Sequence, residues 1–253
     1  SFFLPRRLKH NIATLYSICR YCDNIADNDN KDRSKELKQF INEIKNNKNN
    51  KINILFAENK INISIFDDLI QGLISDQSLI RIKNERELIL YSYKVAGTVG
   101  LMMSKILKVK KKEAFKGAID LGIAMQLTNI ARDVNEDKNR KRQYIKPDFS
   151  SISETIKESE VFYQKSFRSI SGIPLRSRFS VLVARRVYRK IGDYILKQKN
   201  TENYNKAGKI YVTIFGKIIE TLLSIFDFIE LLFVKEINHD NLINHNILEE
   251  EIN

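Results

Sequence analysis

Apolar side chains recur every three to four positions through most of this chain, with few helix-breaking residues between them. Only nine glycines and three prolines occur among the 253 residues. This spacing places apolar side chains on one face of a helix, whereas a half-buried strand needs strict alternation, so the pattern predicts an all-α protein. A chain of this length fits within one large domain, and we predict a single-domain helical bundle spanning residues 1–253.

Clusters of Asp, Asn and Pro separate the expected helices. These helices cover residues 8–27, 34–45, 65–75, 85–107, 111–137, 153–169, 175–197 and 206–235. The Asn- and Lys-rich stretch between residues 46 and 63 predicts a mobile surface loop. The segment 210–233 is very apolar but carries four charged residues, which favours a buried core helix over a membrane span.

The net charge of +12 would suit nucleic acid, an anionic membrane surface or an anionic small substrate. The lysines are scattered among Asn and Ile, as in residues 48–54, and form no cationic stripe with interleaved aromatics, which argues against nucleic acid. No segment is apolar enough to span a membrane and no signal peptide is visible. We therefore expect a cytoplasmic protein, with peripheral membrane contact as an alternative. The start at Ser1 predicts that a short N-terminal piece is missing.

Two cysteines, Cys19 and Cys22, form a lone CxxC pair inside the first expected helix. No second pair and no histidine at ligand spacing accompanies them. Zinc sites of this kind need four ligands, so the pattern favours core packing over metal or redox chemistry.

The first acidic motif places four polar residues on one face of the expected helix 8–27. Tyr16, Arg20, Asp23 and Asp27 follow one another at steps of four, three and four. Two carboxylates one turn apart, about 6 Å along the axis, can each give an oxygen to a shared cluster of hard cations. Arg20 would moderate their repulsion or bind a phosphate.

The second motif repeats this arrangement with Gln126, Asn129, Asp133 and Asp137. Mg²⁺ takes one or two carboxylates from a protein and completes its octahedron with water and phosphate oxygens. Two facing acidic helices therefore suit a diphosphate bound between them. The alternative is a pair of solvated polar stripes with local ion pairs. The apolar surroundings of both motifs favour the binding site.

At these residues the chain resembles the squalene/phytoene synthase family, whose helical terpenoid-synthase fold carries two aspartate motifs on opposing helices. The resemblance extends over nearly the whole length, and residues 95–103 and 124–134 look most like bacterial members that form phytoene. The segments that carry it are LPRRL (4–8), LYSICRYCDNIAD (15–27), FDDLIQGLISD (66–76), YKVAGTVGLMM (93–103), LGIAMQLTNIARDVNED (121–137), RQYIKP (142–147) and IPLRSRFSVLVARRVYRKIG (173–192).

The resemblance implies that the chain is a prenyltransferase of isoprenoid and carotenoid biosynthesis. It would condense two geranylgeranyl diphosphates head to head to phytoene through a cyclopropyl diphosphate, with release of diphosphate. Mg²⁺ is the expected cofactor, with Mn²⁺ as an alternative, and NADPH is not expected. Squalene or dehydrosqualene synthesis from farnesyl diphosphate is one alternative. A non-catalytic member with an assembly or lipid-handling role is another.

The resemblance also implies site residues, position by position. The metal site would comprise Asp23, Asp27, Asn129, Asp133 and Asp137. The substrate would be bound by Tyr16, Arg20, Gln126, Arg132, Arg142, Tyr144 and Lys206. The four aspartates would act in catalysis together with Tyr93 and Tyr188. A central apolar cavity would hold the prenyl tails, lined by residues such as Ile25, Leu101, Met102, Leu121 and Ile123.

Three features of the sequence refine this expectation. Asn24 stands where the family usually has the second Asp of a DDxxD motif, and Lys206 stands where an Arg commonly precedes Ala. Lysine keeps the charge of that arginine but loses its bidentate geometry. Gly97 and Gly100 predict a close helix approach or a local bend beside Tyr93.

Overall fold

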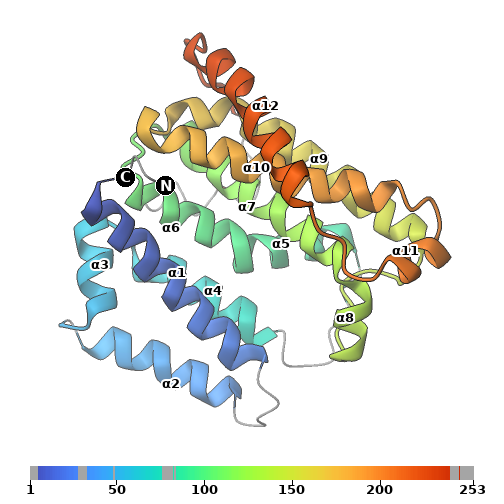
Figure 1. Ribbon diagram of the computed structural model, residues 1–253. Helices are drawn as coiled ribbons and strands as arrows, with labels where there is room; N and C mark the ends of the chain where they lie inside the picture. The colour runs from blue at the N-terminus through green and yellow to red at the C-terminus, as the bar shows by residue number, and fades with distance from the viewer. Residues whose placement is uncertain are drawn as a thin grey trace.

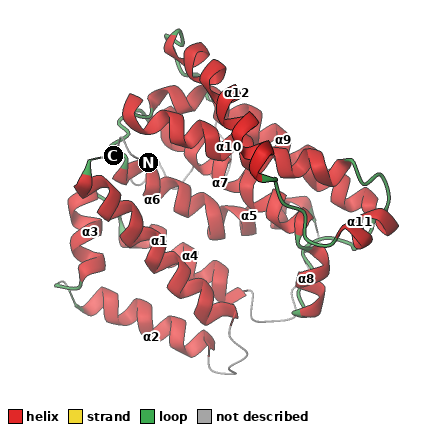
Figure 2. Ribbon diagram, in the orientation of Figure 1, coloured by secondary structure: helices red, strands yellow, loops and turns green. Residues whose placement is uncertain are grey.

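The computed structural model describes residues 5–27, 33–47, 49–75, 82, 84–239 and 245 (Figure 1). No strand occurs in this described part of the chain, which confirms the predicted all-α class (Figure 2). The helices are α1 (Arg6–Asp27), α2 (Arg33–Asn46), α3 (Lys51–Asn59), α4 (Ile63–Ser75), α5 (Glu85–Ser92), α6 (Thr98–Ile106), α7 (Lys112–Arg132), α8 (Val134–Asn139), α9 (Phe149–Ser169), α10 (Leu175–Leu196), α11 (Thr201–Ala207) and α12 (Ile214–Leu232). A π-helical turn at Tyr93–Gly97 joins α5 to α6, and a 3-10 turn at Ile170–Gly172 follows α9.

Helix α7 is surrounded by the rest of the bundle. It packs against α9 along its length and also contacts α6 and α10. Its buried residues occupy every side of the helix rather than one stripe. A Cβ added at Gly117 would lie 2.1 Å from the Cβ of Ser169 on α9, so only glycine permits this close packing. The second acidic motif therefore starts from a rigidly held helix.

The prediction of a mobile loop between residues 46 and 63 is wrong, because this stretch contains α3. The Asn50 side chain caps the helix by accepting a hydrogen bond from the Ile52 amide at 2.9 Å. Ile52, Leu55 and Phe56 are buried and anchor the helix in the core. These residues show helical spacing only over a short stretch among Asn and Lys residues, so the sequence pattern did not reveal this helix.

The expected helix 85–107 is divided by the π-helical turn, which takes the place of the predicted bend beside Tyr93. Single π-helical turns insert one residue into a helix and are frequent at functional sites. A Cβ at Gly100 would lie 2.2 Å from the carbonyl oxygen of Ala118 on α7. The predicted close helix approach is therefore confirmed at Gly100.

The expected helix 206–235 is also divided, at Gly208, which has a φ of 63° between α11 and α12. The prediction of a buried core helix at 210–233 is wrong, because α12 turns most of its apolar side chains to the surface. No helix in the described ranges has both the length and the apolar character needed to cross a bilayer.

The two cysteines have no disulfide partner and pack in and against the core, as predicted. Cys22 is fully buried and Cys19 is half-buried on α1. Burial raises the pKa of Cys19 to about 12, and the neighbouring Asp23 acts in the same direction. Both properties are those of an unreactive structural thiol.

Candidate functional site

A cavity of about 230 Å³ opens between the end of α1 and the ends of α7 and α8. Both acidic motifs contribute to it, since Asp23 and Asp27 come from one and Asp133 and Asp137 from the other. The remaining lining residues are Arg20, Ala26, Leu73, Tyr91, Val95, Gln126, Asn129, Ile130, Arg140, Arg142 and Tyr144. The structure thus brings together carboxylates that lie more than a hundred residues apart in the sequence.

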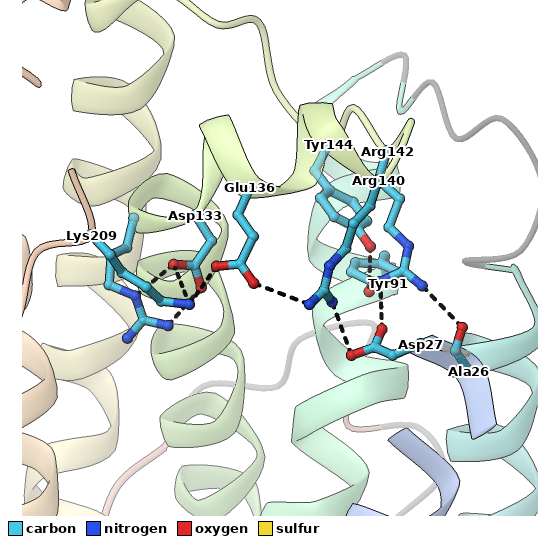
Figure 3. A network of polar contacts seen from close by, with 10 residues as sticks. Ala26, Asp27, Tyr91, Asp133, Glu136, Arg140, Arg142, Tyr144 and Lys209 are labelled. Atoms are coloured by element: carbon cyan, nitrogen blue, oxygen red, sulfur yellow. Dashed lines mark hydrogen bonds and ion pairs between the residues drawn. The ribbon is translucent and has the colours of Figure 1, made fainter. Parts of the chain in front are cut away.

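Asp27 is the last residue of α1, and two arginines bind its carboxylate. Arg142 Nη1 lies 2.9 Å from Asp27 Oδ1, and Arg140 Nη1 lies 2.9 Å from Asp27 Oδ2 (Figure 3). Arg142 also donates to the carbonyl oxygen of Ala26 at 3.2 Å, which satisfies an acceptor at the helix end. The buried Arg142 therefore fixes the first motif against the loop that follows α8.

The second motif was expected on one unbroken helix 111–137, but α7 ends at Arg132 and α8 begins at Val134. Asp133 lies between them with φ −104° and ψ 15°. Its amide still donates to the carbonyl of Asn129 at 2.8 Å, and the Asp137 amide donates to the Asp133 carbonyl at 2.8 Å. The break is therefore slight, and all four residues of the motif still line the cavity.

Tyr204 on α11 closes the C-terminal end of α7. Its hydroxyl lies 2.9 Å from the carbonyl oxygen of Ala131 and 2.8 Å from that of Arg132. The side chain is 1% exposed, and burial raises its pKa to about 12, so it stays a hydrogen-bond donor. Because these carbonyls precede Asp133, Tyr204 sets where that carboxylate lies.

Side chains of alternating charge link the two motifs (Figure 3). Arg132 binds Asp133 in bidentate fashion, through contacts of 2.8 and 2.6 Å. Lys209 Nζ lies 3.4 Å from Asp133 Oδ1 and 2.5 Å from Glu136 Oε2. Arg140 then joins Glu136, at 3.1 Å, to Asp27. These cationic side chains thus neutralise much of the acidic charge beside the cavity.

The donor set around the cavity fits a hard divalent cation. Carboxylate and amide oxygens are the ligands that Mg²⁺ and Mn²⁺ accept, and no soft ligand lines the cavity. The side-chain oxygen of Asn129 is buried and has no hydrogen-bond partner in the described part of the chain. Buried polar atoms are almost always paired, so this one points to a missing ligand. Asp23, Asp27, Asn129, Asp133 and Asp137 could hold such an ion.

The predicted aromatic residues lie at different depths. Tyr144 lines the cavity and stacks on Tyr91, with ring centroids 4.8 Å apart and hydroxyls 3.1 Å apart. Tyr93 is buried at the start of the π-helical turn, and Tyr188 is half-buried on α10. Tyr16, by contrast, is 67% exposed and does not line the cavity.

Lys206 is not brought to this site. It lies near the end of α11 with its side chain 71% exposed, and it pairs with Glu202 one turn earlier at 2.6 Å. After Gly208, which has a positive φ, Lys209 lies beside Asp133 instead. The cation expected in this region is therefore supplied three positions later.

Sequence reasoning missed several residues of this site. Glu136 lies within the second motif and Arg140 follows it closely in the sequence, so their position was a usable signal. Lys209 and Tyr204 carry no such signal, because their contacts depend on how α11 packs against α7. The apolar residues expected to line a tunnel, Ile25, Leu101, Met102, Leu121 and Ile123, are buried in the core and do not line this cavity. Ala26, Leu73, Val95 and Ile130 provide its apolar surface.

A second polar cluster lies away from this cavity. His239 Nε2 lies 2.7 Å from Asp120 Oδ2, and His245 Nε2 lies 3.0 Å from Asp120 Oδ1. Burial alone would raise the pKa of Asp120, but its hydrogen bonds to both histidines outweigh burial and lower it. These contacts attach His239 and His245 to the middle of α7.

Comparison with known proteins agrees with this geometry. The sequence profile described as Squalene/phytoene synthase matches residues 1–149, more than half of the chain. A 15-cis-phytoene synthase from Enterobacter agglomerans is 29% identical over 226 residues, which cover 74% of this chain and 76% of that protein. A chloroplastic phytoene synthase from an Oncidium hybrid cultivar is 33% identical over 177 residues, but this match covers 59% of the chain and only 43% of that relative.

Solved structures share the fold. The crystal structure of a dehydrosqualene synthase in complex with ligand superposes with a TM-score of 0.74 at 25% identity and covers 88% of each chain. A squalene synthase from Alicyclobacillus acidocaldarius superposes with a TM-score of 0.70 at 18% identity, covering 78% of this chain and 86% of that one. With the family profile matched over more than half of its length, this chain belongs to the squalene/phytoene synthase family.

Proposed function

We propose that this protein is a metal-dependent prenyltransferase that condenses two geranylgeranyl diphosphates head to head to phytoene. The single observation that carries the proposal is the cavity shared by Asp23 and Asp27 of α1 with Asp133 and Asp137 beyond α7. Relatives named phytoene synthase support the choice of product.

The divalent ion would be Mg²⁺, with Mn²⁺ as the alternative, held by Asp23, Asp27, Asn129, Asp133 and Asp137. When bound, it supplies positive charge that neutralises the diphosphate as a leaving group. NADPH is not part of the proposal, because proton loss rather than hydride capture ends the reaction.

The arginines of the cavity would bind the diphosphate oxygens. Arg20, Arg140 and Arg142 all line the cavity. Their planar guanidinium groups donate pairs of hydrogen bonds to phosphate oxygens. Charge placed where the leaving group develops negative charge lowers the barrier to ionisation. Lys209 would join them in place of Lys206, because it already lies beside Asp133.

In the first half-reaction the carbon–oxygen bond to one diphosphate breaks and leaves an allylic cation. The double bond of the second substrate attacks this cation, and loss of a proton closes the cyclopropyl diphosphate. In the second half-reaction the remaining diphosphate leaves, the carbon skeleton rearranges and a second proton is lost. Faces of Tyr144, Tyr93 or Tyr188 would stabilise the positive charge, by ~0.5–2 kcal/mol for each ring in contact.

Product analysis tests this proposal. The purified protein is incubated with geranylgeranyl diphosphate and Mg²⁺ alone, and the hydrocarbon extract is identified by mass spectrometry. We expect phytoene from the wild type and at least a hundredfold loss in Asp133→Asn. The matched control is Asp193→Asn, because Asp193 is exposed on α10 and its carboxylate pairs with Lys190 one turn earlier. Equal turnover by Asp133→Asn and the wild type would refute the assigned site.

Dehydrosqualene synthesis from farnesyl diphosphate is a second candidate, favoured by the TM-score of 0.74 with a dehydrosqualene synthase. The same assay with farnesyl diphosphate, with and without NADPH, separates the two candidates and squalene formation. A thirty-carbon product at the higher kcat/KM would replace the proposed substrate and leave the site assignment intact.

A further inference from the structure

Helix α12 has its polar side inward and its apolar side outward. The buried residues on the side facing α10 include Gly216, Glu220, Ser224 and Asp227. The outward apolar side chains include Ile214 at 80% exposure, Phe215 at 72%, Leu222 at 56%, Phe226 at 69%, Ile229 at 46% and Phe233 at 78%. Most surface helices of globular proteins show the opposite arrangement.

Ion pairs with α10 hold this orientation in place. Arg186 binds Asp227 through two contacts of 2.6 and 2.7 Å and reaches Glu220 at 3.3 Å. Lys190 lies 3.7 Å from the other oxygen of Glu220. Glu220 and Asp227 are 5% and 7% exposed, so turning α12 over would separate buried charges from their partners. These contacts therefore fix which side of α12 faces outward.

The outward side is largely apolar, and we call it the α12 face (Ile214–Phe233). Exposed Lys217 and Glu230 lie toward its two ends. The α12 face follows a helix of 19 residues, about 28 Å long. Between Lys217 and Glu230 its outward positions carry no ionised side chain, because the two acids of this stretch point inward. A contiguous apolar surface of this extent marks a contact with a membrane or a partner.

We propose that the α12 face docks the protein on an anionic lipid bilayer, with α12 lying in the plane of the interface. The charge of the chain selects this occupant. At a formal +12, two copies repel each other, whereas an anionic surface attracts the protein. Exposed Lys217 and Lys235 lie near the two ends of the α12 face, where they would meet lipid headgroups, and exposed Glu230 and Glu236 lie at its C-terminal end. Figure 1 shows α12 on the outside of the bundle, with its last turns projecting beyond α10.

Docking in this way would also place the acidic cavity near the membrane. Lys209, which contacts Asp133 and Glu136, lies only two residues before Tyr211, which is 62% exposed at the start of the apolar region. The proposal does not depend on which prenyl substrate is used.

Vesicle co-sedimentation tests the proposal with the full chain and no prenyl substrate, so the result is independent of the reaction proposed above. The vesicles are phosphatidylcholine alone and phosphatidylcholine mixed with phosphatidylglycerol. We expect the wild type to bind the anionic vesicles more strongly, and Phe215→Ser/Phe226→Ser to lose at least tenfold in partition coefficient. The control Ile54→Ser/Val161→Ser removes two exposed apolar side chains from α3 and α9 and should bind like the wild type.

Circular dichroism and the thermal midpoint establish that each variant is folded before binding is compared. Wild-type binding by the folded α12 variant, or equal binding to both kinds of vesicle, would overturn the proposal. If the wild type does not bind vesicles but forms a dimer, and the α12 variant is a monomer, the α12 face would instead be assigned to contact with a second copy of the chain.

Discussion

The hydroxyl of Tyr204 lies 2.8 Å from the carbonyl oxygen of Arg132, the residue immediately before Asp133. This contact joins α11 to the end of α7 and satisfies carbonyls that no helical amide reaches. The position of a cavity-lining carboxylate therefore depends on a side chain some seventy residues later in the chain.

Tyr204→Phe removes this hydroxyl and nothing else. Two buried carbonyls then lose a donor, so we expect the free energy of unfolding to fall by about 1–3 kcal/mol. Turnover should fall further than stability alone explains, because Asp133 is no longer held. Urea unfolding and steady-state kinetics measure the two effects. Tyr211→Phe, at an exposed tyrosine, is the control and should change stability by less than about 0.5 kcal/mol.

Arg142 and Arg140 both bind Asp27 but differ in burial. Arg142→Gln should lower the free energy of unfolding by about 2 kcal/mol, because the Ala26 carbonyl and Asp27 lose a buried charged donor. Arg140→Gln should cost less than about 1 kcal/mol, because that side chain is 43% exposed. Thermal unfolding of both variants tests the order. Equal losses would mean that the burial of Arg142 is unimportant.

Asn129→Ala separates binding from stability. The buried side-chain oxygen of Asn129 has no partner among the described residues, so its removal should leave the free energy of unfolding unchanged or slightly higher. The affinity for Mg²⁺ in the presence of inorganic diphosphate should fall at least tenfold, as isothermal titration calorimetry would measure. A clear loss of stability with unchanged Mg²⁺ affinity would assign the side chain a structural role.

Lys209→Ala and Lys206→Ala form a matched pair. Lys209 contacts Asp133 and Glu136, so its removal should reduce kcat/KM at least tenfold. Lys206 pairs with Glu202 at the surface, and its removal should have little effect. A larger loss of kcat/KM in Lys206→Ala than in Lys209→Ala would instead support the role of Lys206 expected from the family pattern.

The contacts of Asp120 with His239 and His245 predict a pH dependence of stability. The pKa of Asp120 is lowered in the folded protein, so its contribution is fully present above the unfolded value near 3.9. The contribution is lost as the pH falls through the lower, folded value. The difference in free energy of unfolding between the wild type and Asp120→Asn should therefore shrink as the pH falls below about 4. A constant difference would show that the charge of Asp120 is not involved.

The helices of this fold could largely be predicted because their signals are local. Apolar spacing located α1, α4, α9 and α10 to within a few residues. It failed for α3, a short helix in an Asn- and Lys-rich stretch that is anchored by the buried Ile52, Leu55 and Phe56. Apolar content also predicted burial of α12, but the orientation of that helix depends on Arg186, which lies on another helix.

The candidate site was predictable where its residues repeat at helical steps. Asp23, Asp27, Asp133 and Asp137 could be selected from spacing, and they do share a cavity. The break at Asp133 and the approach of Lys209 could not be foreseen, because both depend on contacts between distant segments. Local periodicity identifies which side chains point the same way, but not what binds them.

The π-helical turn Tyr93–Gly97 inserts one extra residue between α5 and α6. A single added residue rotates everything that follows by about 100° around the helix axis. The sides of α5 and α6 that meet the core are thus out of phase by that angle, and deleting any one residue of the turn would bring them into register. Leu101 and Met102, which are fully buried, would then rotate by the same angle away from the core. Because of this turn, α5 and α6 follow one another without a loop and yet face the core with different sides.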